Sequence, residues 1–325
     1  EALYQVRDEL PTFRAHNEQA MAHAAIAYGK ANFRRRFMAA TSSIGPGALN
    51  MVTAAALAHV NRLPVLFLPG DVFANRLPDP VLQQAEDFSD GTATVNDCFR
   101  AVSRYFDRIT RPEQIIPALN RAMQVLTDPA ECGPVTLSLC QDVQAEAYDY
   151  PESLFAERVW TPRRLRPDRN ELAAAVAALK GAKKPLVIAG GGVLYSQASS
   201  ELAKLVQGAG IPVCETQGGK SSLPDDHPLN MAAAGVTGTS AANQLAEEAD
   251  VVLAVGTRLQ DFTTGSWALF KNAGRTIIGL NTQVFDAGKH WALPLVADAA
   301  EGLSELGAAL KGWKAPAAWT DNALK

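Results

Sequence analysis

The segment AHNEQAMAHAA, residues 15–25, places groups capable of proton transfer in a run of small side chains. Glu18, His16 and His23 are side-chain types that serve as general acids or bases. The alanines between them would let a helix approach a neighbouring element or a ligand closely. Two interpretations of Glu18 follow: it is a solvated residue on a helix surface, or it is a carboxylate held in place for chemistry.

A second segment, TSSIGPG at residues 41–47, is typical of a turn that opens a helix. Pro46 fixes its own φ, and the glycines on either side would let the backbone come close to a ligand at the start of the helix. The alternative is a tight turn between a strand and a helix, with proline at the first helical position and no ligand.

A third segment, the three glycines at residues 190–192, lies between a predicted strand and a predicted helix, where a dinucleotide-binding turn would lie. The GxGxxG pattern fails, because Tyr195 stands at the position of the third glycine. Glycines at the end of a strand also suit a tight turn or close packing without a ligand. Nucleotide binding therefore stays an alternative here.

Short apolar runs alternate with helical stretches along the whole chain. This alternation predicts βα units on mostly parallel sheets. The first half gives helices at 1–10, 17–30, 48–60 and 112–126, and strands at 37–41, 64–70 and 133–140. The second half gives strands at 184–189, 211–216, 250–258 and 275–281, and helices at 198–208, 241–249 and 299–311.

A polar, proline-bearing stretch from Gln141 to Asn170 separates the two halves, and its composition suits a linker. The predicted fold class is α/β, with two doubly wound, mostly parallel-sheet domains. The predicted boundaries are a first domain at 1–150, a linker at 151–168, a second domain at 169–312 and a tail at 313–325.

Composition excludes several classes of protein. The 325 residues are 47% hydrophobic and 20% charged, with a net charge of −4, as in an ordinary globular protein without a basic field for nucleic acid. The basic run at 34–36 suits a solvated corner. No apolar run reaches the about 18 residues that a membrane span needs. The four cysteines have no metal-ligand spacing and no signal peptide is evident, so we expect a cytoplasmic protein.

Taken in order, these segments resemble a known family. AHNEQAMAHAA, ATSSIGPGALN, GGGVLYSQ, IPVCETQGGKSSLPDDHPLNM and ADVVLAVGTRLQD are similar to the pyrimidine-binding domain and the Rossmann-like central domain of thiamine-diphosphate enzymes of the acetolactate synthase type. The resemblance covers nearly the whole chain. It implies thiamine diphosphate and Mg²⁺ as cofactors.

Three further segments, FANRLPDPVLQQAE, SRYFDRITRPEQ and QDVQAEAYDY, resemble the ring-opening hydrolases of this family, which act in myo-inositol catabolism. The implied reaction is hydrolysis of a C–C bond in a cyclic diketone, a trihydroxycyclohexane-1,2-dione, to 5-deoxy-glucuronate. Two alternatives stay open. One is a 2-keto acid decarboxylase or carboligase with the same cofactor, and the other is a non-catalytic nucleotide-binding module that uses the turn at 190–192.

The resemblance also assigns roles to residues. Glu18 matches the carboxylate that hydrogen-bonds N1′ of the aminopyrimidine and so promotes loss of the C2 proton of the thiazolium. We expect a poorly solvated position to raise its pKa. Pro46, Gly47 and Asn50 match the GPGxxN turn that lies against the cofactor.

The substrate side is less sharply assigned. Gln83 or Gln84 matches a glutamine near the substrate, and the doubled glutamine leaves the register open. His23 matches a family histidine, with helix packing as the alternative. Asp71 stands where carboligase relatives have glutamine, so that contact is not carried over.

Arg258 and Asp261 match part of the FAD pattern that carboligase relatives carry, but the ring-opening hydrolases imply no flavin. FAD is therefore not expected in this protein.

Other parts of the family pattern are missing from this sequence. The GDG motif that holds Mg²⁺ on a C-terminal diphosphate-binding domain is absent, so we assign no metal ligand in this chain. We also expect the first strand of the pyrimidine-binding domain to be missing from this sequence. Because the family's active site forms between two subunits, we expect a homo-oligomer, at least a dimer, and expect this chain to be inactive alone.

Overall fold

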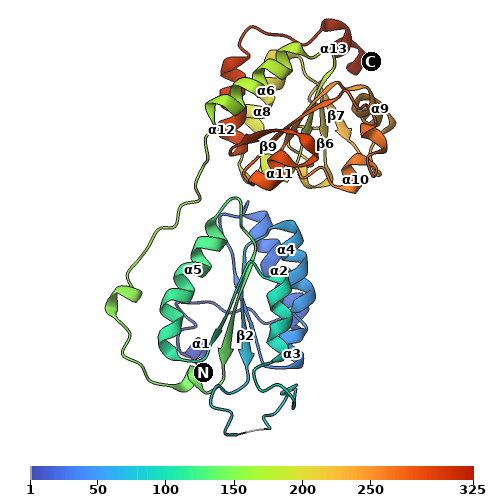
Figure 1. Cartoon of the computed structure of the whole chain (residues 1–325). Coiled ribbons are helices and arrows are strands. Elements are labelled where there is room, and N and C mark those ends of the chain that lie inside the picture. The colour runs from blue at the N-terminus through green and yellow to red at the C-terminus, as the bar shows by residue number, and fades with distance from the viewer. Residues whose placement is uncertain (1, 79, 86) are drawn as a thin grey trace. The chain divides into compact units, whose positions relative to one another are not determined.

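The computed structural model describes residues 2–78, 80–85 and 87–325, which form two compact units at 1–162 and 163–325 (Figure 1). The boundary lies among the residues for which we predict a linker. Each unit has a parallel sheet covered by helices, which confirms the predicted α/β class.

The described residues of the first unit form a four-stranded parallel sheet in the order β1-β2-β4-β3. The strands are β1 (Ala39–Ser42), β2 (Val65–Asp71), β3 (Tyr105–Ile109) and β4 (Pro134–Cys140). The α-helices are α1 (Ala2–Gln5), α2 (Glu18–Ala31), α3 (Pro46–Leu49), α4 (Val52–Asn61) and α5 (Ile115–Thr127). The 3₁₀ helices are η1 (Val95–Val102), η2 (Pro112–Gln114), η3 (Val143–Ala145) and η4 (Glu152–Leu154).

Helices cover both faces of this sheet, with α5 on one side and α2 and α4 on the other (Figure 1). The central strands are accordingly apolar on both faces, as in parallel sheets generally. Phe67 of β2 and Val135 and Leu137 of β4 are fully buried. The carboxyl ends of the strands therefore form one edge, and the segments that follow β1, β2 and β4 lie there together.

The described residues of the second unit form a six-stranded parallel sheet in the order β10-β9-β8-β5-β6-β7. The strands are β5 (Pro185–Ala189), β6 (Val213–Glu215), β7 (Asn230–Ala233), β8 (Val251–Val255), β9 (Thr276–Asn281) and β10 (Leu293–Val296). The α-helices are α6 (Arg169–Gly181), α7 (Gly191–Tyr195), α8 (Ser199–Ala209), α9 (Ser240–Glu248), α10 (Asp261–Thr264), α11 (Val284–Gly288), α12 (Ala299–Ala309) and α13 (Ala317–Ala323). The 3₁₀ helices are η5 (Gln217–Gly219), η6 (Ala268–Phe270) and η7 (Lys289–Trp291).

Alternation along the central strands gives the second unit two apolar layers. Val187 of β5 packs in one cluster with α6, α8 and α12, whereas its neighbours Leu186 and Ile188 pack in another with α9 and α13. Successive side chains of a strand point to opposite faces, so a continuous apolar run serves both layers.

The structure differs from the predicted elements at several places. The helix predicted at 1–10 is confined to α1, which buries no side chain. The helix predicted at 48–60 is two helices, because Asn50 ends α3 and Met51 precedes α4. Strands β3, β7 and β10 and helices α6, α10, α11 and α13 were not predicted.

Both ends of the second unit are fastened to its core. Arg164 donates to Asp298 Oδ1 at 2.9 Å, and the backbone amide of Asp298 donates to the Leu165 carbonyl at 2.9 Å. Trp319, within the residues predicted as a tail, is buried and donates its indole N–H to the Pro185 carbonyl at 2.8 Å. Residues 163–168 and α13 therefore belong to this unit.

Across the described ranges, no helix has the length and apolar character required to span a bilayer.

Candidate active site

The Gly-Pro-Gly turn lies at the carboxyl edge of the first sheet, between β1 and α3. Gly45 has a φ of +62° and a ψ of −123°, a conformation that side chains with a Cβ rarely adopt. Pro46 follows at the first helical position, as the sequence predicts. The turn thus places the start of α3 beside the start of α2.

Glu18 and Asn50 meet although 32 positions separate them in the sequence. Glu18 is the first residue of α2, whose N-cap is Asn17. Asn50 follows α3, and its side-chain amide donates to Glu18 Oε2 at 3.1 Å. The structure therefore places two of the predicted site residues in direct contact.

Gly47 completes this arrangement. A Cβ built on Gly47 would lie 3.3 Å from Glu18 Oε1 and would collide with the Ser43 hydroxyl. Gly47 itself is buried, while Glu18 and Asn50 are half-buried. Because Gly47 has no side chain, the turn can pack closely against Ser43 and the Glu18 carboxylate.

The predicted direction of the Glu18 pKa is wrong for this chain. The amide of Asn50, together with the backbone amide of Glu18 itself, holds the pKa of the Glu18 carboxyl below its ordinary value. Hydrogen bonds to the charged form favour it, and half-burial opposes them only weakly. Glu18 is therefore a carboxylate at neutral pH, with Oε1 facing the Gly47 turn.

Replacing Asn50 with alanine should raise the Glu18 pKa toward its ordinary value, because the donor that stabilises the carboxylate is lost. A carboxyl group with a depressed folded-state pKa stabilises the fold above its unfolded-state pKa. That contribution is lost as the pH falls through the folded-state pKa. The variant should accordingly lose a little stability at neutral pH and none in acid.

A carbon-detected NMR titration of the Glu18 carboxyl would measure this shift. Asn32→Ala is a matched control, since Asn32 lies at the other end of α2 and donates to the Tyr28 carbonyl. An Asn50→Ala midpoint equal to that of the wild type would contradict the assignment.

The loop between β2 and η1 brings the two glutamines to the turn. A Cβ built on Gly45 would collide with the backbone carbonyl of Gln83, so this part of the loop lies directly against the turn. Gln84 accepts a hydrogen bond from the Val81 amide at 3.3 Å through its side-chain oxygen, within the loop itself. Gln83 is exposed and has a φ of +63°. The geometry therefore favours Gln83 as the side chain presented to a ligand.

The structure does not bring the histidines to Glu18. His23 is half-buried five residues along α2, which rotates it by about 140° from Glu18 around the helix axis. His16 is exposed and precedes α2. The packing interpretation of His23 fits this position better than a role beside the carboxylate.

A buried polar network at the same edge was missed by the sequence analysis. Asp71, at the end of β2, is 2% exposed and accepts from Arg108 Nε at 2.7 Å and from the Ser138 hydroxyl at 2.6 Å. Burial lowers the pKa of Arg108, but its bonds to Asp71 and Asp97 outweigh burial and leave the pKa raised. The signal in the sequence was an arginine inside the run YFDRI, which gives no hint of its partners.

The glycines at 190–192 are accounted for by packing within the second unit. A Cβ on Gly190 would lie 2.5 Å from the Gly256 carbonyl oxygen, and a Cβ on Gly192 would lie 2.5 Å from Gly256 Cα. Arg258 and Asp261 follow β8 at this edge, with Arg258 half-buried and Asp261 exposed. These contacts explain the glycines without a nucleotide.

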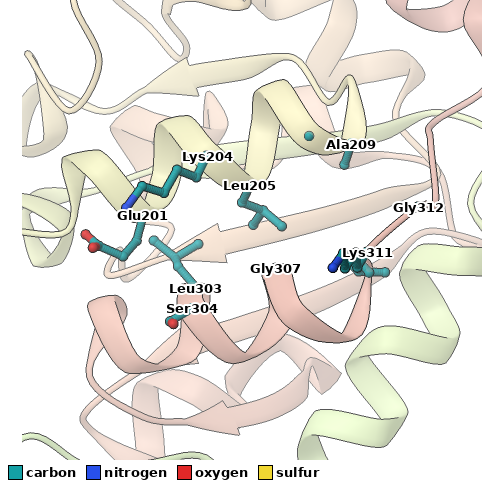
Figure 2. Close-up of a pocket in the computed structure, with 11 residues that line it drawn as sticks. Glu201, Lys204, Leu205, Ala209, Leu303, Ser304, Gly307, Lys311 and Gly312 are labelled. Carbon is teal, nitrogen blue, oxygen red and sulfur yellow. The ribbon is translucent and has the colours of Figure 1, made fainter.

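A separate groove of about 340 Å³ lies between α8 and α12 (Figure 2). Leu205 and Leu303 line it, with Glu201 and Lys204 also on its wall. Gly208 and Gly307 leave open space there, since a Cβ on either would meet no atom within 4 Å. The groove is a gap between two helices, and none of the predicted site residues lines it.

The donor set beside Glu18 fits an aminopyrimidine. A carboxylate that can hydrogen-bond a ring nitrogen lies next to the buried Gly47 of the turn. A metal ion has no corresponding site. Over residues 2–78, 80–85 and 87–325, His, Cys, Asp and Glu form no group of three or more that could hold one.

Comparison with known proteins matches both units to family models. Residues 1–90 match the N-terminal TPP-binding domain of thiamine pyrophosphate enzymes, and residues 172–306 match their central domain. Together these matches cover more than half of the chain.

Curated relatives are similar along nearly the whole chain. The 3D-(3,5/4)-trihydroxycyclohexane-1,2-dione hydrolase of Geobacillus thermodenitrificans is 50% identical over 95% of this chain and 48% of its own length. The Clostridium perfringens protein of the same name is 49% identical over 96% of this chain and 49% of its own length. A Bacillus cereus relative with that name is 50% identical over 94% of this chain. The chain thus spans about half the length of these relatives.

Proposed function

Because this chain belongs to the thiamine pyrophosphate enzymes, with their N-terminal binding domain and their central domain, we propose that it is part of a hydrolase that opens the ring of 3D-(3,5/4)-trihydroxycyclohexane-1,2-dione. The observation that carries the proposal is about 50% identity to hydrolases of that name along 95% of the chain. The contact between Glu18 and Asn50 beside Gly47 supports it, because that geometry suits the cofactor.

Glu18, Pro46, Gly47 and Asn50 are the residues that would hold the aminopyrimidine of thiamine diphosphate. The bound cofactor supplies a carbon nucleophile that adds to a carbonyl group of the substrate. Glu18, ionised at neutral pH in the absence of ligand, would hydrogen-bond N1′ of the bound cofactor. Ligand binding removes water from this carboxylate, which raises its pKa and lets it share that proton. Asn50 bonds Oε2, which leaves Oε1 as the atom that would bond N1′.

The remaining parts of the proposal concern the longer protein. The Mg²⁺ ligands would belong to that protein outside this chain. The active site is completed by a second subunit, so the enzyme is at least a dimer. A cytoplasmic location suits the cysteine pattern, and the described thiols are free.

Product analysis of the full-length enzyme tests this function. With thiamine diphosphate and Mg²⁺ present, the cyclic dione should be converted to an open-chain acid, detected by NMR or mass spectrometry. Pyruvate, the substrate of a decarboxylase or carboligase, should be turned over at least about a hundredfold more slowly, a difference of roughly 2.7 kcal/mol in transition-state free energy. Pyruvate turnover at rates rivalling those of the dione would overturn the proposal.

A further inference from the structure

The loop that carries Gln83 is fastened at both ends by side chains outside it. Asp71 immediately precedes the loop, and Thr94 and Asp97 lie where it enters η1. On the outgoing side, Asp142 accepts from the backbone amides of Ala74 at 2.8 Å and Asn75 at 3.1 Å. The position of the middle of the loop therefore depends on the contacts that hold its two ends together.

Arg108 of β3 joins the two ends. Its Nε donates to Asp71 Oδ2 at 2.7 Å, at the end of the loop that leaves β2 (the outgoing side). Its Nη2 donates to the Thr94 hydroxyl at 2.6 Å and to Asp97 Oδ1 at 3.0 Å, at the end of the loop that enters η1 (the returning side). One guanidinium thereby bridges positions 23 residues apart, which a planar group with several donors can do and a single ammonium cannot.

The partners of Arg108 are themselves held by the fold. Asp71 also receives the Ser138 hydroxyl, and Ser138 lies opposite Arg108 in the register of β3 and β4. Thr94 and Asp97 form a capping box at the start of η1. Both anchors are therefore rigid, and the bridge between them transmits the geometry of the sheet to the loop.

We propose that Arg108 is a positioning residue for the substrate side of the site: by bridging the two ends of the loop, it sets where Gln83 lies against the Gly45 turn. The proposal rests on the proposed function, since it takes Gln83 to face the substrate. Arg108 does not touch the substrate. It acts on the binding of the dione through the loop, and it has no role beside Glu18.

The exposed Arg76 provides a direct readout of the loop. It is the one basic residue between positions 72 and 94, so trypsin cleavage after it reports opening of this loop alone. In the full-length enzyme, Arg108→Gln should accelerate this cleavage at least about tenfold and raise the KM for the dione about tenfold. The kcat should fall less than about threefold, and the dissociation constant of thiamine diphosphate should stay within about twofold of the wild type.

Two companions sharpen the test. Arg108→Lys keeps the charge beside the buried Asp71, so the protein folds, but it can serve only one end of the loop. It should show the same changes at a smaller size. Arg100→Gln is the matched control, because Arg100 pairs with Asp97 at 2.7 Å and so holds the returning end without bridging to Asp71. It should behave as the wild type.

Wild-type cleavage at Arg76 and wild-type KM in both Arg108 variants would overturn the inference. Faster cleavage with an unchanged KM would overturn the substrate role, and equal acceleration at every tryptic site would show general destabilisation instead. If the wild-type enzyme does not open the dione, the proposed function fails, and the role of Arg108 at the substrate fails with it. In that case cleavage at Arg76 still shows separately whether Arg108 holds the loop.

Discussion

Replacing Glu18 with glutamine is expected to slow exchange of the thiamine diphosphate C2 hydrogen for deuterium by about two to four orders of magnitude in the full-length enzyme, the range that acid–base groups usually contribute. Glutamine preserves the shape of the side chain and can still accept from Asn50. It carries no charge and cannot share a proton with N1′. The loss should therefore fall on proton transfer, with the fold retained.

Exchange followed by ¹H NMR after acid quench measures this effect directly. Glu152→Gln is a suitable control, because Glu152 is an exposed glutamate that also begins a helical turn. Circular dichroism should be the same for both variants, and the unfolding midpoint of Glu18→Gln should fall only slightly, because the stabilised carboxylate is lost. An exchange rate in Glu18→Gln equal to that of the wild type would return Glu18 to the role of a solvated helix residue.

Gly45→Ala is expected to weaken binding of thiamine diphosphate at least about tenfold. The φ of +62° and ψ of −123° at this position cost an alanine about 1–3 kcal/mol. The added methyl group would also overlap the backbone carbonyl of Gln83, which cannot rotate away as a side chain could. The turn or the loop has to move, and Glu18, Gly47 and Asn50 then lose their alignment.

Isothermal titration of the full-length enzyme with the cofactor and Mg²⁺ measures this loss. Gly208→Ala is the matched control, because Gly208 lies in α8, where an added Cβ meets no atom within 4 Å. That change should leave cofactor binding unaltered and stabilise the helix by about 0.5–1 kcal/mol. Wild-type affinity in Gly45→Ala would show that this turn does not lie against the cofactor.

The strands that the sequence predicts best are those covered on both faces. Residues 185–189 and 251–255 are buried throughout, and their unbroken apolar runs predict buried strands. The strands that were missed, β3, β7 and β10, all lie at an edge of their sheet. In β3 the polar residues Asp107 and Arg108 interrupt the apolar pattern, whereas β7 and β10 are only 4 residues long.

The residues of the site could be predicted from the sequence, but the contacts between them could not. Glu18, Pro46, Gly47 and Asn50 were identified because they lie in two short segments that resemble a known family. The bond between Glu18 and Asn50, and the bridge from Arg108 to Asp71, depend on which strands are neighbours and in which register. Those pairs are 32 and 37 positions apart, so no local pattern could reveal them. The direction of the Glu18 pKa was mistaken for the same reason.

The hydrogen bonds of Arg164, Leu165 and Trp319 determine which residues a fragment of the second unit has to include. A gene fragment starting at codon 169 would remove the arginine that neutralises the nearly buried Asp298 at the start of α12, and the carbonyl that accepts its amide. One stopping at codon 312 would uncover the apolar surface beneath Trp319. Truncation at 163–325 keeps every one of these bonds, and it is the boundary to choose for calorimetry or crystallisation of that unit.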